Sequence, residues 1–263
     1  MFALFAFEVL DVSRGTVGLL HAHQDRAVLA AAIDAGLAQT IYDLGIEDRA
    51  RRLPVDGLPR VSSFDGAKLI ITVADERGKV AINNVGPDVE RQLFAAAGVS
   101  GDRLDILVDS LEDWKDPDSV SRPHGAELPY YLQFGLKPRD GVIRTIDELG
   151  KIRGMDAALL ARISPAITVL PSGGAGFNAN TAPALAMEAM KGIGNASFDI
   201  QKRQQELAGE RTALDIADDV PVAGRSLSIR VEAKLSDGSS GAREAVVEFT
   251  GNSQQPYWLR SVR

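Results

Sequence analysis

Apolar residues recur at helical spacing in an alanine-rich segment near the start of the chain, residues 24–44. Positions three or four residues apart share one face of an α-helix, and the apolar ones here are Ala27, Leu29, Ala30, Ile33, Ala38, Ile41 and Leu44. Asp25 can cap the start of such a helix, and Gly45 can end it. The pattern predicts a helix over Gln24–Leu44 with an apolar face to bury.

The pattern changes to strict alternation near the C-terminus. Between Ser226 and Leu235 every second residue is apolar, which is typical of a half-buried β-strand. The segment Ser236–Gly241 contains an Asp-Gly pair and predicts a hairpin turn, and Glu244–Phe249 and Tyr257–Val262 are predicted as further strands. One face of this meander must be covered, and the Gln24–Leu44 helix is the expected cover.

One further strand is predicted in the first third of the chain. Arg49–Ser63 contains two prolines and is predicted as a connector. Lys68–Ala74 is rich in β-branched residues and is predicted to join the same sheet. It ends at the turn signal Asp75–Gly78, after which Val80–Asn83 resumes briefly as a strand.

The middle of the chain contains a weak internal repeat of helical hairpins. In each of three segments an apolar residue, a glycine and a second apolar residue precede a helical apolar pattern. The three segments run from Leu93 through Gly98 to Leu107, from Leu149 through Gly154 to Ile163, and from Ala189 through Gly192 to Phe198. The repeat predicts an α+β protein in which an all-α body is inserted between the two chain ends. The predicted division is 1–79, 80–220 and 221–263.

Four carboxylates cluster around the loop after the first hairpin: Asp113, Asp116, Asp118 and Glu127. Pro117 and Pro123 prevent a continuous helix there, so the acids lie on a looping backbone. Repulsion between them must be relieved by water, basic partners or a cation, and Ca²⁺ accepts six to eight oxygen ligands in flexible geometry. The spacing is not that of an EF-hand. Two interpretations stay open, a structural Ca²⁺ site and a solvated acidic loop.

Composition excludes several classes of function. The net charge of −7 disfavours broad phosphate-backbone binding, and the absence of cysteine excludes disulfides and thiolate metal sites. The sequence contains no Gly-x-Ser-x-Gly elbow, Walker loop or His-Glu-x-x-His motif, so we predict that the protein is not an enzyme. The run Gly173–Gly176 is predicted as a flexible turn rather than a phosphate loop.

Gly192-Ile-Gly194, with Lys191 beside it, fits the pattern of nucleic-acid-binding helix-hairpin-helix units. The second hairpin instead has Asp156 where a phosphate would lie, and the chain is acidic overall. Nucleic-acid binding is therefore kept as the alternative function, and no nucleic acid is expected as a partner.

The first residues form a short apolar segment. Met1–Phe7 is wholly apolar, but Glu8, Asp11 and Arg14 place charges directly after it, and a membrane span requires about 20 apolar residues. The segment is expected to be either a core-packing start or the remnant of a longer apolar helix.

Several motifs in order resemble the K-class minor pseudopilin of bacterial type II secretion. They are Asp75–Lys79 with Asn83, Asp113–Asp118 with Gly125–Glu127 and Tyr131, Ile146–Leu149 with Gly154, and the Asn-Ala-Asn-Thr-Ala-Pro segment of Phe177–Pro183. The resemblance covers nearly the whole chain from about Asp25 and implies a pilin-like fold, with a long N-terminal helix on an antiparallel sheet and a large helical insertion.

The resemblance also implies a function, partners and a location. It implies a non-catalytic protein at the tip of the pseudopilus, in complex with I- and J-class minor pseudopilins and anchored in the bacterial inner membrane facing the periplasm. Calcium is associated with the inserted region of this family, which makes Asp113, Asp116, Asp118 and Glu127 candidate ligands. Met1–Leu10 is similar to the far end of the family's membrane helix, so the N-terminal span is expected to be truncated here.

Overall fold

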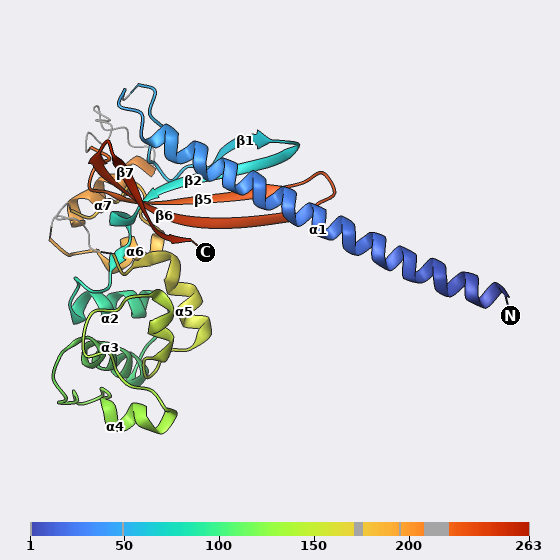
Figure 1. Cartoon of the computed structure of the whole chain (residues 1–263). Helices are drawn as coiled ribbons and strands as arrows, with labels where there is room; N and C mark the ends of the chain where they lie inside the picture. Colours follow the sequence, from blue (N-terminus) through green and yellow to red (C-terminus); the bar gives the residue numbers. More distant parts are fainter. Residues whose placement is uncertain (1, 49, 171–175, 195, 208–220, 263) are drawn as a thin grey trace. The chain divides into compact units, whose positions relative to one another are not determined.

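The computed structural model describes residues 2–48, 50–170, 176–194, 196–207 and 221–262 (Figure 1). The chain packs as two compact units. The first, here called the sheet unit, consists of Met1–Val73 and Leu227–Arg263. The second, the middle unit, is Ala74–Ser226. Of the predicted glycine turn Gly173–Gly176, only the last residue lies within the described residues.

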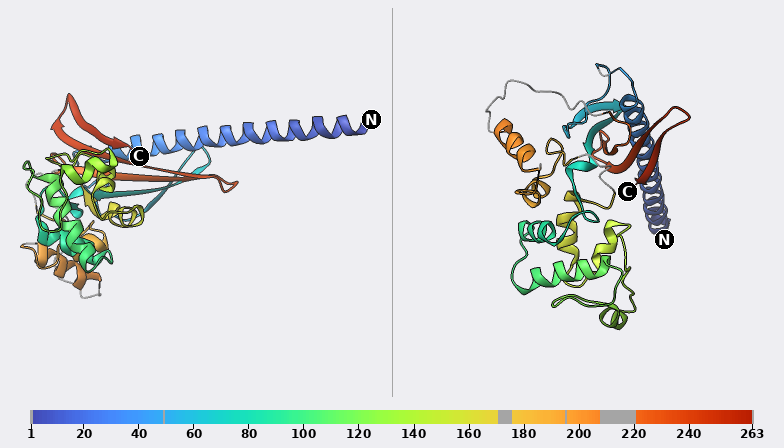
Figure 2. Two further views of the ribbon diagram at one scale, coloured as in Figure 1. Left: turned by 90° about the horizontal axis from the view of Figure 1, so that it is seen from below. Right: turned by 90° about the vertical axis from the view of Figure 1, so that its left-hand side faces the viewer.

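The predicted helix is present as part of a longer one, α1 (Phe2–Leu44). Its C-terminal part lies alongside the sheet and contacts β6 (Ser240–Asn252) most extensively, whereas its N-terminal part extends beyond the strands (Figures 1 and 2). Of the apolar face predicted for this helix, Leu29, Ile33 and Leu44 are buried, whereas Ala27 and Ala38 are exposed. The helix also buries Ala32 and Leu37, which the prediction did not include. At Gly36 a Cβ atom would lie 3.1 Å from Val231 and 3.2 Å from Leu69, so a glycine permits the closest approach of helix and sheet.

The sheet has five strands in the order β1-β2-β5-β6-β7. Besides β6 they are β1 (Arg60–Phe64), β2 (Ala67–Asp75), β5 (Ser226–Lys234) and β7 (Gln255–Val262). The predicted strands are confirmed, and the four alternating apolar residues of β5 are all buried. β7 lies at the edge and is exposed along its length.

The prediction that Arg49–Ser63 is only a connector is wrong at its end. Arg60–Phe64 forms β1, which pairs antiparallel with β2 from Arg60 opposite Ile71 to Phe64 opposite Ala67. The turn between them is Asp65-Gly66, and both residues have positive φ, 44° and 79°. This Asp-Gly pair is a typical two-residue hairpin turn, so the strand was signalled by the turn rather than by its own polar sequence.

The middle unit contains the three predicted hairpins. The first is α2 (Pro87–Ala96) and α3 (Asp102–Lys115), the second η3 (Ile146–Lys151) and α5 (Ala157–Ile163), and the third α6 (Ala184–Ala189) and α7 (Ala196–Leu207). The glycines at the three turns, Gly98, Gly154 and Gly192, have φ of 89°, 86° and 81°. This left-handed conformation favours glycine and explains why the repeat is marked by that residue.

The remaining elements of the middle unit are short. They are η1 (Glu76–Gly78), β3 (Val80–Ala81), α4 (Leu128–Tyr131), η2 (Leu132–Phe134), η4 (Ser164–Ala166) and β4 (Ile167–Thr168). β3 and β4 pair in parallel, with the buried residues Val80 and Ile167 opposite each other. The prediction of an all-α middle region is therefore wrong in this respect, because two β-branched segments distant in sequence pair inside its core. The predicted division into 1–79, 80–220 and 221–263 stays a prediction.

Candidate functional site

The acidic loop begins where α3 is forced to end. Asp116 caps the helix with φ of −79° and ψ of 159°, the extended conformation that a residue before proline prefers. Pro117 thus turns the chain out of the helix and separates Asp113, on the last turn, from Asp118, in the loop. Glu127 comes nine residues later, directly before α4.

Three of the four candidate ligands come together. Carboxylate oxygens of Asp116, Asp118 and Glu127 lie within 4.8 Å of one another. Two buried oxygens, Asp116 Oδ1 and Glu127 Oε1, have no hydrogen-bond partner among the residues that the structure describes. Ca²⁺ binds oxygens at 2.3–2.6 Å, so ligands on opposite sides of one ion are separated by about 5 Å. The separation of these oxygens therefore fits a shared cation.

The fourth candidate, Asp113, lies outside that group. Its side chain is fully buried, and its Oδ1 accepts hydrogen bonds from Arg122 Nη1 at 2.7 Å and from the Arg122 backbone N–H at 3.2 Å. Ser121 Oγ donates to Oδ2 at 3.4 Å. Asp113 therefore holds the loop through Arg122 in this structure.

Arg122 also pairs with the candidate ligand Asp116, at 2.5 Å from Nη1 to Oδ2. Partial burial opposes its charge, but the hydrogen bonds to Asp116 and Asp113 outweigh that effect and raise the pKa of Arg122. Sequence reasoning missed this residue, although a single arginine inside an acidic stretch was the available signal. Arg122 leaves one oxygen of Asp116 without a partner, so the arginine and a cation can be held at once.

The electrostatics of Glu127 reflect this crowding. Burial, followed by the charges of Asp113 and Asp116, raises the pKa of Glu127 to about 6. A divalent cation would reverse this effect by favouring the ionised form of all three ligands. The donor set is entirely carboxylate oxygen, which suits Ca²⁺ or Mg²⁺ rather than a soft metal.

A second cluster of motif residues surrounds Asp75 at the end of β2. Asp75 Oδ2 is 2.6 Å from Arg77 Nη2 and 2.5 Å from Arg225 Nη2, and its backbone N–H donates to Thr181 Oγ1 at 3.3 Å. Gly78 packs so closely on Thr181 that a Cβ atom would lie 2.7 Å from its Oγ1. The motifs Asp75–Lys79 and Phe177–Pro183 thus form one structural network. Arg77 and Arg225 in this network are cations and cannot serve as metal ligands.

Comparisons with known proteins agree with this architecture. Residues 70–172 match the family model described as "Type II secretion system (T2SS), protein K". Type II secretion system protein K of Dickeya chrysanthemi is 31% identical over 167 residues, which are 60% of this chain and 42% of that protein. A putative type II secretion system protein K of Escherichia coli (strain K12) is 33% identical over 101 residues, 36% of this chain and 31% of that protein. The chain spans less than half the length of these relatives.

A solved structure shares the fold. It is "The Crystal Structure of the GspK-GspI-GspJ complex from enterotoxigenic Escherichia coli Type 2 Secretion System", one chain of which matches with a TM-score of 0.60 at 15% identity. The match covers 94% of this chain and 98% of that one. Its fold therefore extends over both units described above.

A helix on a five-strand antiparallel sheet, with a helical middle region matched by the family model, is the architecture that this chain shares with a component of type II secretion. More specifically, the chain is similar to members of the type II secretion system protein K family. This is a family of non-catalytic pseudopilins, as the resemblance implied.

Among the described residues, one segment is long and apolar enough to cross a membrane, Ala22–Leu44 within α1. It is a weak indication, because the core helix of a soluble protein or a signal sequence meets the same criteria of length and composition.

Proposed function

We propose that this chain is a minor pseudopilin that caps the tip of the type II secretion pseudopilus and thereby supports protein secretion across the outer membrane. The observation that carries the proposal is the insertion of the middle unit, residues 74–226, between β2 and β5, which are neighbours in one sheet. If this subunit repeated along a narrow shaft, its neighbours would have to accommodate this large insertion in every copy. It can be accommodated at an end, where nothing packs beyond it.

The sheet unit serves in this proposal as a pilin-like frame. Its two parts, within 1–79 and 221–263, hold an inserted domain at 80–220. α1 packs with the helices of I- and J-class minor pseudopilins, and the head lies on the periplasmic side of the inner membrane. The solved complex supports this assignment of partners, since it contains a protein of the same fold together with GspI and GspJ.

Two measurements test the role at the tip. Mixed with the soluble heads of the I and J pseudopilins, this chain is expected to elute as one complex in size-exclusion chromatography, whereas the head of the shaft-forming pseudopilin serves as the control partner. Absence of a complex with I and J would remove the main support. Labelled chain should mark a single end of isolated pseudopili in electron micrographs, and label along the shaft would contradict capping.

We also infer that Asp116, Asp118 and Glu127 hold a structural Ca²⁺ ion. The unpartnered buried oxygens of Asp116 and Glu127 support this assignment, as does the crowding that raises the pKa of Glu127. Asp113 would reach the ion only by releasing Arg122, so its proposed role is to position the arginine and the loop. The bound ion would tie the end of α3 to the start of α4.

Thermal unfolding with calcium and with a chelator tests the site. Calcium at 100 times its Kd should stabilise the protein by about 2.7 kcal/mol, which corresponds to a rise of roughly 5–10 °C in Tm. The double variant Asp116→Ala with Asp118→Ala should lose the gain, whereas Asp147→Ala, at an exposed acid of the same unit, should keep it. Identical melting curves with calcium and with chelator would exclude a stabilising site.

The nucleic-acid alternative has no comparable support. Lys191 beside the third hairpin turn lies 3.6 Å from Glu188, and both side chains are exposed. A carboxylate next to the lysine at that turn disfavours phosphate binding there.

A further inference from the structure

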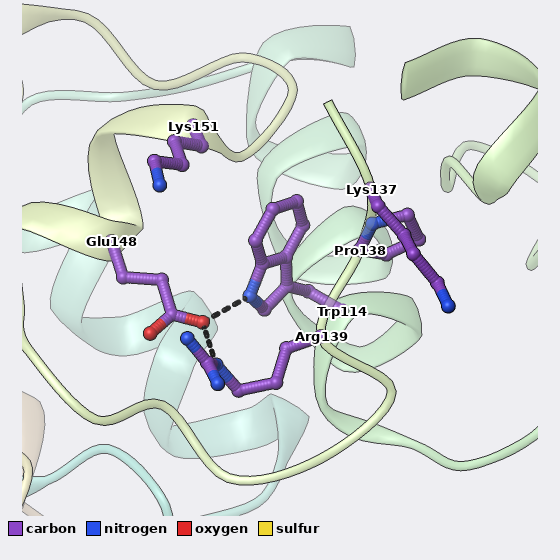
Figure 3. Close-up of a pocket in the computed structure, with 6 residues that line it drawn as sticks. All are labelled: Trp114, Lys137, Pro138, Arg139, Glu148 and Lys151. Carbon is purple, nitrogen blue, oxygen red and sulfur yellow. Dashed lines mark hydrogen bonds and ion pairs between the residues drawn. The ribbon is translucent and has the colours of Figure 1, made fainter. Parts of the chain in front are cut away.

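A pocket of about 280 Å³ opens on the middle unit and is lined by residues other than the three candidate metal ligands (Figure 3). Trp114 of α3, Glu148 and Lys151 of η3, and residues 137–139 line it. Three basic residues and one acidic residue line it, a net charge of +2. This is unusual on a chain whose net charge is −7.

Glu148 does not balance the charge of the lysines. Its Oε1 accepts a hydrogen bond from Trp114 Nε1 at 2.9 Å and pairs with Arg139 Nε, and its Oε2 accepts from the Arg144 backbone N–H at 3.2 Å. Burial alone would raise the pKa of Glu148, but these bonds outweigh it and lower the pKa. Both of its oxygens are therefore committed to other groups.

Lys137 and Lys151 are the two basic residues of the pocket lining that do not pair with Glu148. Both side chains are exposed, and neither pairs with a carboxylate in the part of the chain that the structure describes. Two lysines that flank a pocket without anionic partners create a positive potential inside it. A negatively charged ligand would be attracted to that position.

The size of the pocket limits the ligand. A water needs about 10–15 Å³ of cavity volume, so 280 Å³ has room for one carboxylate side chain with several waters. A monoanion also suits the site better than a phosphate dianion, because Glu148 remains ionised at its base. The pocket is therefore suited to an Asp or Glu side chain.

Exposed apolar residues lie close to the pocket along the chain. Phe134 is 62% exposed and Leu132 is 61% exposed. Lys137 is the third residue after Phe134, so their Cα atoms are at most about 11 Å apart. The ring of Phe134 is linked to Trp114 through Tyr130 and Tyr131, with centroid distances of 5.3, 5.2 and 4.9 Å between successive rings.

We propose that this pocket binds the carboxylate of an acidic peptide segment in another protein, with Lys137 and Lys151 as its ion-pair partners and an apolar residue of the same segment on Leu132 and Phe134. A free anion would use the lysines alone. A peptide with adjacent acidic and apolar side chains uses both features, which makes it the favoured ligand. The proposal does not depend on capping at the pseudopilus tip.

Tryptophan fluorescence of the full chain tests the proposal. The chain has two tryptophans, so Trp258→Phe leaves Trp114 as the only one and makes it a probe of the pocket. The probes are the acetylated, amidated pentapeptides GLEFG and GLQFG, together with sodium acetate and inorganic phosphate. We expect the Glu peptide to bind at least tenfold more tightly than the Gln peptide and more tightly than either free anion.

Variants assign the effect to named groups. Lys137→Gln with Lys151→Gln should reduce the preference for the Glu peptide to less than twofold, whereas Lys191→Gln, at an exposed lysine elsewhere in the unit, should leave it unchanged. Phe134→Ser should weaken both peptides about threefold and preserve their ratio. Equal binding of the two peptides, an unchanged preference in the lysine variant, or equally tight binding of acetate or phosphate would each overturn the proposal. Unchanged melting temperatures verify that the variants are folded.

Discussion

The tightest packing around the acidic loop is the contact between Gly125 and Asp113. A Cβ atom added to Gly125 would lie 1.9 Å from Asp113 Oδ2 and 2.7 Å from its Cγ. Asp113 is fully buried, and Arg122 fixes it from the other side. The carboxylate therefore cannot move aside without leaving its arginine.

Gly125→Ala is thus expected to destabilise the protein strongly. Overpacking a well-filled site costs about 1–3 kcal/mol. Removing one partner of a buried ion pair destabilises a protein by about 3–5 kcal/mol. Displacement of Asp113 weakens its ion pair with Arg122 and should therefore add part of that cost. We expect a total loss of about 3 kcal/mol. For a unit of this size the loss corresponds to a fall of roughly 6–12 °C in Tm.

The unfolding of the middle unit can be followed through Trp114 fluorescence in the Trp258→Phe background. Gly141→Ala is the matched control, because the nearest atom to its added Cβ lies 4.0 Å away. We expect the control to unfold within about 2 °C of the parent. A Gly125→Ala variant that also unfolds within about 2 °C of the parent would refute the close contact and the role given to Asp113.

Two further predictions concern buried charges of the same unit. Burial, despite the opposing effect of Lys115, raises the pKa of Glu90 to about 8. The protonated Glu90 contributes stability that is fully present below pH 4.5 and is lost as the pH rises through 8. Glu90→Gln cannot ionise, so from pH 5 to pH 9 its free energy of unfolding in urea should fall by at least about 1.4 kcal/mol less than that of the parent. An equal pH slope in Glu90→Gln, with exposed Asp88→Asn as control, would contradict this prediction. Burial alone would raise the pKa of Asp75, but Arg77 and Arg225 outweigh that effect and lower the pKa. The ionised Asp75 therefore contributes stability that is present at neutral pH and is lost as the pH falls below about 4. Asp75→Asn should destabilise by about 3–5 kcal/mol at pH 7, and a loss below about 1 kcal/mol would contradict the network.

The sequence alone determined those features whose signals are local. Alternation predicted β5 and its inward residues, helical spacing predicted α1 and part of its buried face, and glycines marked the three hairpin turns. The acidic loop was also recognisable, because the prolines around it restrict the backbone regardless of what packs nearby.

Tertiary structure alone decided how the charges of the loop are shared. The four acids look equivalent in sequence, but only Asp116, Asp118 and Glu127 come together, while Asp113 lies outside that group and shares Arg122 with Asp116. The pairing of β3 with β4 and the bond between Asp75 and Arg225 were equally beyond prediction, since each joins segments far apart in the chain. Burial and electrostatic pairing depend on distances in space, and spacing along the chain does not encode those distances.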